Sequence, residues 1–149
     1  MKLQRAVAAL ILAALLAIFN VQACSLKPKG ERVSARDGVV SIDGKQVGSG
    51  AVRVFRYPAA GKEVVFFVAR SRSGEIRTAF DACVTCFPNH MGYRQEGDCL
   101  VCIFCNTSFR MDELDKGKGN CVPIKINNRL EGDRVLIDQK DLEAGSAWF

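Results

Sequence analysis

Two pairs of cysteines with a fixed spacing constrain this chain more than any other feature of its sequence. Cys83 and Cys86 form the first pair, Cys102 and Cys105 form the second, and 15 residues separate the two pairs. Two intervening residues let both thiolates of a pair face one ion from a single tight loop, and two such loops supply four sulfur ligands at tetrahedral corners. The spacing therefore predicts a metal centre with these four cysteines as ligands.

The first 23 residues are typical of an export signal. Lys2 and Arg5 precede an apolar run over residues 6–19, which is shorter than the roughly 20 residues that a membrane-spanning helix needs. The sequence Val21-Gln22-Ala23 before Cys24 resembles a lipobox, and it predicts cleavage after residue 23 and acylation of Cys24 as a lipid anchor. Ordinary cleavage before an incidental cysteine is the alternative. The signal has no twin-arginine pair, so we expect export as an unfolded chain.

These features divide the chain into three parts. Residues 1–23 are interpreted as a lipoprotein-type signal peptide, residues 24–36 as a polar tether with Pro28 and Gly30, and residues 37–149 as one folded domain. The formal net charge of the whole chain is +5, and removal of two basic residues with the signal leaves only a weak positive charge. Basic residues are interspersed with acidic ones, so the charge pattern gives no reason to expect a nucleic-acid partner.

The domain over residues 37–149 has the pattern of an all-β fold. Short apolar or alternating segments of strand length recur between turn signals, and only residues 141–143 indicate a helical turn. Asp43-Gly44 reads as a hairpin turn, and the continuous apolar run 64–69 reads as a strand buried on both faces. The expected strands are 39–42, 52–57, 64–69, 76–82, 100–104, 122–126 and 134–138. We therefore expect a small β-sandwich or barrel that follows an N-terminal signal helix.

Other uses of the cysteines must be weighed against a metal centre. Six cysteines in an exported domain allow a disulfide framework, but their clustering argues against it, because disulfides usually close large loops. A redox dithiol of the thioredoxin type needs a helix after the Cys-x2-Cys pair, and none is expected here. No histidine follows either pair, which excludes attachment of a c-type haem. Zinc and iron–sulfur clusters both accept four thiolates, so the spacing does not separate these cofactors.

Several segments resemble the FtrD-like membrane iron–sulfur domain family. They are residues 81–86, 92–98, 101–105, 119–123 and 142–145, together with the terminal Phe149. The run Gly-Tyr-Arg-Gln-Glu-Gly-Asp over 92–98 is the most specific of them. The resemblance implies a bacterial, membrane-associated protein that binds an iron–sulfur cluster and accompanies a ferrous-iron permease. Cys121 lies in a matching segment, whereas Cys99 does not.

A looser likeness to the Rieske cluster-binding fold is also present. Its cluster has two cysteine and two histidine ligands, and in this chain Cys86 and Cys105 would take the histidine positions. We expect Cys99 to lie outside the ligand set, because alternation along a strand directs it away from Cys102. Cys121 and His90 are candidates for additional ligands, with Cys121 equally plausible as a disulfide partner or as a cap over the site.

The sequence thus predicts an exported electron carrier rather than an enzyme with its own substrate. It would be anchored in the bacterial cell envelope facing the periplasm, and it would pass single electrons in an iron-uptake system. Its partners would be an iron permease and periplasmic redox or iron-binding proteins. Export as an unfolded chain favours a metal captured outside the cytoplasm, so a structural zinc-binding interaction module is the first alternative. A thiol–disulfide protein without metal is the second.

Overall fold

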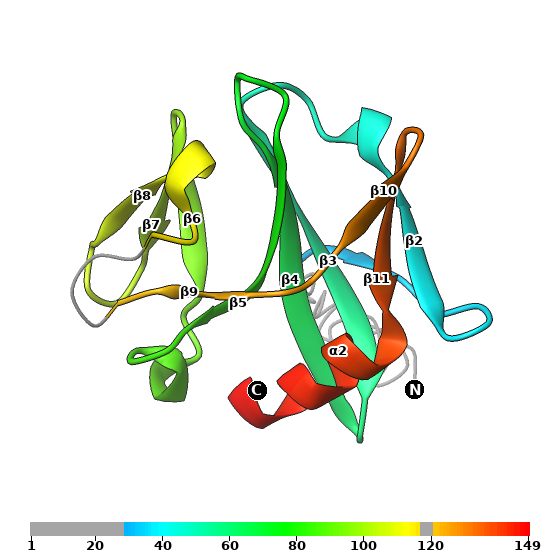
Figure 1. Ribbon diagram of the computed structural model, residues 1–149. Coiled ribbons are helices and arrows are strands. Elements are labelled where there is room, and N and C mark those ends of the chain that lie inside the picture. Colours follow the sequence, from blue (N-terminus) through cyan, green and yellow to red (C-terminus); the bar gives the residue numbers. More distant parts are fainter. Residues whose placement is uncertain (1–28, 117–120) are drawn as a thin grey trace, which may run out of the picture.

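The computed structural model describes residues 29–116 and 121–149 and is built mainly of strands (Figure 1). The signal peptide and Cys24 lie outside the described residues. The strands are β1 Glu31–Arg32, β2 Val39–Asp43, β3 Ala51–Ala59, β4 Lys62–Arg70, β5 Ile76–Cys83, β6 Tyr93–Glu96, β7 Cys99–Cys102, β8 Ser108–Arg110, β9 Pro123–Lys125, β10 Arg129–Glu131 and β11 Arg134–Asp138. The described residues also form one short α-helix, α2 Gln139–Ala144, and four 3-10 turns. These turns are η1 Gly44–Gln46, η2 Phe87–Asn89, η3 Met111–Glu113 and η4 Gly145–Trp148. The predicted all-β class is confirmed.

A five-stranded sheet in the order β1-β3-β4-β5-β9 forms the centre of the molecule. Its middle strand, β4, contains the apolar run 64–69, which is buried on both faces as the sequence predicts. Val64, Phe66 and Val68 face one core, while Phe67 and Ala69 face a second core on the opposite side. Successive side chains of a strand point to opposite faces, so one continuous apolar strand serves two cores.

The other two sheets each cover part of this central sheet. The sheet β10-β11-β2 closes the first core together with α2, and the sheet β6-β7-β8 closes the second (Figure 1). Leu142 of α2 is completely buried in the first core, whereas Leu100 of β7 and Phe109 of β8 are buried in the second. The sheets pack in layers and do not close into a barrel.

The segment after β2 is not the hairpin turn that Asp43-Gly44 suggests. β2 pairs with β11, whereas β3 pairs with β4, so the two strands that flank the turn lie in different sheets. The Asp43 side chain accepts a hydrogen bond from the N–H of Lys45 and caps η1, and the N–H of Gly44 bonds to the carbonyl of Asp133. Asp-Gly here starts a helical turn because a local cap competes with the hairpin geometry.

The chain enters the domain along one edge of the central sheet. β1 pairs in parallel with β3, with Glu31 opposite Phe55, and the N–H of Val33 bonds to the carbonyl of Arg56. The described part of the segment interpreted as a tether is therefore packed on the domain. None of the helices among the described residues has the length and apolar character needed to cross a membrane.

Candidate metal centre

The first cysteine pair lies where β5 leaves the central sheet. Cys83 is the last residue of β5, and Cys86 immediately precedes η2. The N–H of Val84 donates to the carbonyl of Val122, which brings the chain segment of Cys121 beside this loop. The pairing of Cys83 with Pro123 of β9 fixes the same approach from the sheet.

The second pair occupies the turn between β7 and β8. Cys102 ends β7. The N–H of Asn106 donates to the carbonyl of Cys102, and the N–H of Cys102 donates to the carbonyl of Thr107. Asn106 has a φ of 56°, a left-handed conformation that asparagine tolerates better than most residues. The N–H of Ile103 donates to the carbonyl of Gly92, so the second loop is also tied to the segment that leads into β6.

Five cysteine sulfurs meet between these loops. The Sγ atoms of Cys83, Cys86, Cys102 and Cys121 lie within 4.8 Å of one another, and all four residues are buried. Cys105 lies at the exposed edge of this group, with its Sγ 3.4 Å from that of Cys121, which in turn lies 2.8 Å from that of Cys83. The structure thus joins three of the four predicted ligands with Cys121 and keeps the fourth, Cys105, in contact with them.

This arrangement fits a metal bound by thiolates. Structural zinc and iron–sulfur clusters are both held by four cysteines, and the group offers more than that number of sulfur donors from three chain segments. Apolar side chains of the second core surround it. Leu100, Phe109, Met111 and Leu114 are all nearly inaccessible to water. The cysteine group therefore has the ligands that a thiolate-bound metal requires, and most of its sulfurs are buried beside an apolar core.

The thiols of the group differ in pKa because their neighbours differ. Burial opposes the ionisation of Cys83, but hydrogen bonds from the Cys121 thiol and from backbone N–H groups outweigh it and lower its pKa. Burial and hydrogen bonds with the other thiols raise the pKa of Cys121, and they raise that of Cys86 to about 12. At Cys105 burial is outweighed by hydrogen bonds from the hydroxyl and N–H of Thr107, and the pKa falls to about 6. Cys121 is thus placed to donate its S–H to ionised neighbours.

Tyr93 completes the polar surroundings of the sulfurs. Its ring lies edge-on to Phe67 and Phe109, and its buried hydroxyl has no hydrogen-bond partner among the described residues. Burial, followed by the charges of Cys83, Cys121 and Cys102, raises the pKa of Tyr93, which is buried in the same core as these cysteines. An unpaired buried donor costs free energy, and a thiolate or sulfide bound in the group is an acceptor that would satisfy it.

A buried carboxylate holds the segment before β6 against β5. Asp81 accepts a hydrogen bond from the N–H of Tyr93 and forms an ion pair with Lys29, with 2.5 Å between Nζ and Oδ2. Burial nevertheless raises the pKa of Asp81, against the effect of Lys29. Gly92 has a φ of 67°, and a Cβ there would lie 2.4 Å from the Asp81 carboxylate. Glycine at this position is what allows the close approach of the two segments.

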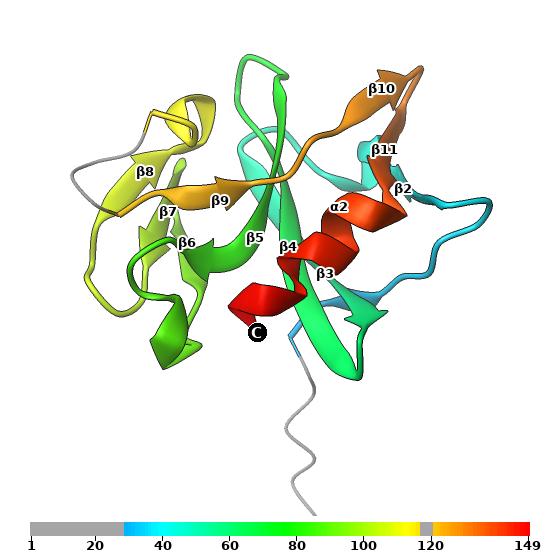
Figure 2. The same cartoon turned by 60° about the horizontal axis from the view of Figure 1, so that its bottom comes forward.

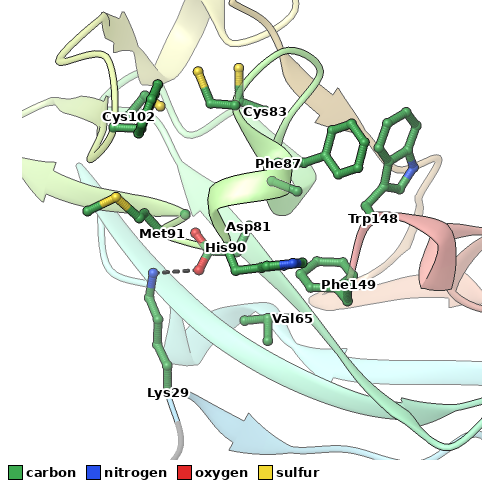
Figure 3. Close-up of a pocket in the computed structure, with 14 residues that line it drawn as sticks. Lys29, Val65, Asp81, Cys83, Phe87, His90, Met91, Cys102, Trp148 and Phe149 are labelled. Atoms are coloured by element: carbon green, nitrogen blue, oxygen red, sulfur yellow. Dashed lines mark hydrogen bonds and ion pairs between the residues drawn. The ribbon is translucent and has the colours of Figure 1, made fainter.

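A hollow beside the sulfurs is lined by residues of both cysteine loops and of the C-terminal segment (Figure 3). The ion pair of Lys29 with Asp81 lies on one side of it, and Phe87 packs edge-on against Trp148 on the other. His90, the histidine considered as a ligand, is exposed, lines the hollow and has a left-handed φ of 50°. 

Cys99, which the sequence analysis expects outside the ligand set, is half-buried in β7 and is not part of the four-sulfur group. Sequence reasoning did not identify three other features of this centre. The contact of Cys121 with Cys83, the Tyr93 hydroxyl and the Asp81 ion pair all depend on distant segments. The family-like runs 81–86, 92–98 and 119–123, which contain Asp81, Tyr93 and Cys121, were the signal in the sequence that these positions matter.

Comparison with protein families agrees with this geometry. A family model described as "Membrane iron-sulfur containing protein FtrD-like" matches residues 47–149, which include both cysteine pairs and Cys121. The match covers most of the chain and nearly all of the described domain. No curated protein matches the chain.

Proposed function

This chain belongs to the FtrD-like family of membrane iron–sulfur proteins, and on that premise we propose that it is an electron carrier with one iron–sulfur cluster. Cys83, Cys86, Cys102 and Cys105 would hold the cluster, one pair from each loop. The observation that carries the proposal is that the two cysteine loops meet in the structure. The family match covers both loops. When bound, such a cluster gains and loses single electrons.

The residues of this chain would support the cluster in three ways. The apolar side chains of the second core exclude water, which affects the reduction potential. Cys121, 2.8 Å from the Sγ of Cys83, would cap the ligands as a hydrogen-bond donor, because two thiolates bound to metal normally stand farther apart. Cys105 is exposed, so it marks the edge of the group at which an electron would enter or leave.

We place the protein in the bacterial cell envelope, anchored through Cys24 and facing the periplasm. The basic and apolar leader supports export, and the family is described as membrane-associated. Its partners would be an iron permease and periplasmic redox or iron-binding proteins. Electron transfer to or from iron would set the valence of the metal for transport, and the protein itself would catalyse no bond chemistry.

One observation favours a second function, a structural zinc-binding module. Four thiolates at 2.3 Å from one ion stand about 3.8 Å apart, and the sulfurs of Cys83, Cys86, Cys102 and Cys121 already lie within 4.8 Å of one another. This compact set suits a single ion, whereas a cluster places several irons and sulfides between its ligands. In the zinc module Cys121 would be the fourth ligand and Cys105 the spare thiol, and the sulfurs of Cys83 and Cys121 would have to separate from 2.8 Å to about 3.8 Å.

The two functions are separated by metal content and by two matched variants. The protein is expressed in iron-replete cells, purified without oxygen, and analysed for iron, zinc, visible absorption and a reversible one-electron change. For the cluster we expect Cys105→Ser to lose iron and colour, because an alkoxide is a poorer ligand than a thiolate, while Cys121→Ser keeps both. Zinc that is lost from Cys121→Ser and kept by Cys105→Ser would establish the structural module. A metal-free protein with oxidised cysteines would instead support the thiol–disulfide alternative.

A further inference from the structure

We infer that the face formed by the cysteine loops rests on the phospholipid bilayer, and that the ion pair between Lys29 and Asp81 helps to set this orientation. The inference rests on the proposed membrane anchor. It concerns how the domain is presented to the membrane, which neither the family description nor the cysteine pattern addresses.

The first support is the distribution of exposed apolar side chains. Among the described residues, four large apolar side chains are about half exposed or more: Val84 at 48%, Met91 at 46%, Phe104 at 52% and Leu130 at 56%. Val84 and Phe104 lie at the tips of the two cysteine loops, and Met91 follows η2 in the segment tied to the second loop. Only Leu130, on β10, lies elsewhere. Apolar side chains gathered on one face mark a surface that contacts protein or lipid.

The second support is the character of the hollow between these loops. Its lining includes the half-buried aromatic side chains of Trp148, Phe149 and Phe87. Among the described residues that line it, Asp81 supplies the one side-chain carboxylate, and Lys29 pairs with it. Tryptophan favours the level of the lipid headgroups. A carboxylate paired with a lysine costs less to bring toward a bilayer than an unpaired one.

The third support is where the chain that leads to the anchor joins the domain. Lys29 lies on the rim of this hollow, where its Nζ contacts the Asp81 carboxylate and, at 2.8 Å, the carbonyl of Tyr93 (Figure 3). Cys24 is five residues earlier, and five residues reach at most about 18 Å when fully extended. The ion pair therefore ties the chain down on the cysteine-loop side before β1 continues along β3.

The turned view shows the consequence for orientation. In Figure 2 the start of the described chain, η2 and the C-terminal end all lie toward the bottom of the molecule, while β10 lies at the top. A bilayer below this end would meet the segment around η2 and the turn between β3 and β4, and it would leave β10 with Leu130 in water. We favour lipid over a protein partner because the short connection from Cys24 keeps Lys29, on the rim of this hollow, within about 18 Å of the anchor.

Photocrosslinking on the full chain in native membranes tests the orientation. p-Benzoylphenylalanine replaces Phe104 in one variant and, as a matched control, Leu130 in another. After irradiation, mass spectrometry of the peptide that carries the probe identifies what it has captured. We expect phospholipid adducts at position 104 and none at position 130. A protein adduct in place of lipid at 104, or equal lipid adducts at both positions, would overturn the inference.

A second set of variants tests the ion pair. Lys29→Gln should lose most of the lipid adduct at position 104, and Lys29→Arg should restore it because the charge returns. Lys45→Gln, which removes an exposed ion pair with Asp133 outside the hollow, should leave the adduct unchanged. If Lys29→Gln left the lipid adduct at position 104 unchanged, the ion pair between Lys29 and Asp81 would have no role in the orientation. A chain found in the soluble fraction would refute the membrane anchor itself. A chain that stays in the membrane fraction without lipid adducts at position 104 would refute only the proposed orientation.

Discussion

At the scale of single residues, the hydroxyl of Tyr93 is the group best placed to tune a bound cluster. It is buried near the sulfurs and lacks a partner among the described residues. A hydrogen bond to a thiolate or sulfide stabilises the more negative, reduced state and raises the reduction potential. We therefore predict that Tyr93→Phe lowers the potential, measured by redox titration of the visible spectrum. The ring contacts with Phe67 and Phe109 remain, so the fold should be kept.

The other tyrosine of the chain provides the control. Tyr57 is buried in the first core, on the far side of the central sheet from the cysteine group. Tyr57→Phe should leave the potential unchanged. Equal potentials in wild type and Tyr93→Phe would show that the hydroxyl does not reach the cluster sulfurs.

Cys105 provides a pH-dependent prediction for the metal-free protein. Its pKa of about 6 lies below the ordinary thiol value, so Cys105 is a thiolate at neutral pH and becomes a thiol as the pH falls through 6. The thiolate is the nucleophile. Alkylation by iodoacetamide, followed at the Cys105 peptide by mass spectrometry, should be half-maximal near pH 6 and reach a plateau above it.

A variant can remove the hydrogen bond between Cys105 and the Thr107 hydroxyl, which accepts from the thiol and donates to the thiolate. The Oγ1 of Thr107 lies 3.2 Å from the Sγ of Cys105. Thr107→Val should shift the alkylation profile of Cys105 to higher pH, because the thiolate loses a donor. A profile that stays in place would assign the low pKa to other neighbours.

At the scale of elements, the longer apolar strands were predictable and the short polar ones were not. β2, β3, β4, β5, β7, β9 and β11 all overlap expected strands, because each carries a buried apolar run or an alternating one. β6 and β10 consist mainly of exposed polar residues, and β1 is only two residues long. These segments are strands because they pair with neighbouring strands, and the hydrophobic pattern of their own sequence does not indicate that pairing.

The candidate site shows the same division. The two Cys-x2-Cys pairs are local, so their spacing alone predicted that they would meet. The position of Cys121 depends on the pairing of β9 with β5, where Pro123 lies opposite Cys83, and this contact joins residues far apart in the sequence. Lys29 and Asp81 are likewise 52 positions apart. Contacts of this kind follow from the assembled fold and not from a motif.

The junction of α2 and η4 depends on a glycine in contact with the central sheet. A Cβ on Gly145 would lie 2.1 Å from the ring of Phe80, which is buried in the first core. We predict that Gly145→Ala lowers the free energy of unfolding by about 1–3 kcal/mol, because the ring or the helix must shift. Chemical denaturation of the metal-loaded protein measures the change.

Gly48 is a matched control for this substitution. A Cβ there would meet only the Cβ of Ala51, at an ordinary contact distance of 3.7 Å. Gly48→Ala should change the free energy of unfolding by less than about 0.5 kcal/mol. If Gly145→Ala were equally neutral, the C-terminal segment would not be held tightly against Phe80.

At the scale of the whole molecule, the two cores differ in their dependence on metal. The first core joins long strands to α2 and contains no cysteine among its buried residues. The second contains Cys83, Cys86, Cys102 and Cys121 among its buried residues, and its covering sheet has strands of only three or four residues. A sheet this small is marginally stable without further support. Metal bound by both loops would supply that support, because binding free energy contributes to folding.

We therefore predict that removal of the metal loosens one side of the molecule and leaves the other intact. Hydrogen exchange of the metal-loaded and metal-free proteins, followed by mass spectrometry, should show lost protection in β6, β7 and β8. Protection in β2 and β11 should persist, because their hydrogen bonds and the apolar side chains beneath them do not involve the cysteines. Equal loss of protection on both sides would mean that the two cores unfold as one unit, and no loss on either side would mean that the thiols alone hold the second core together.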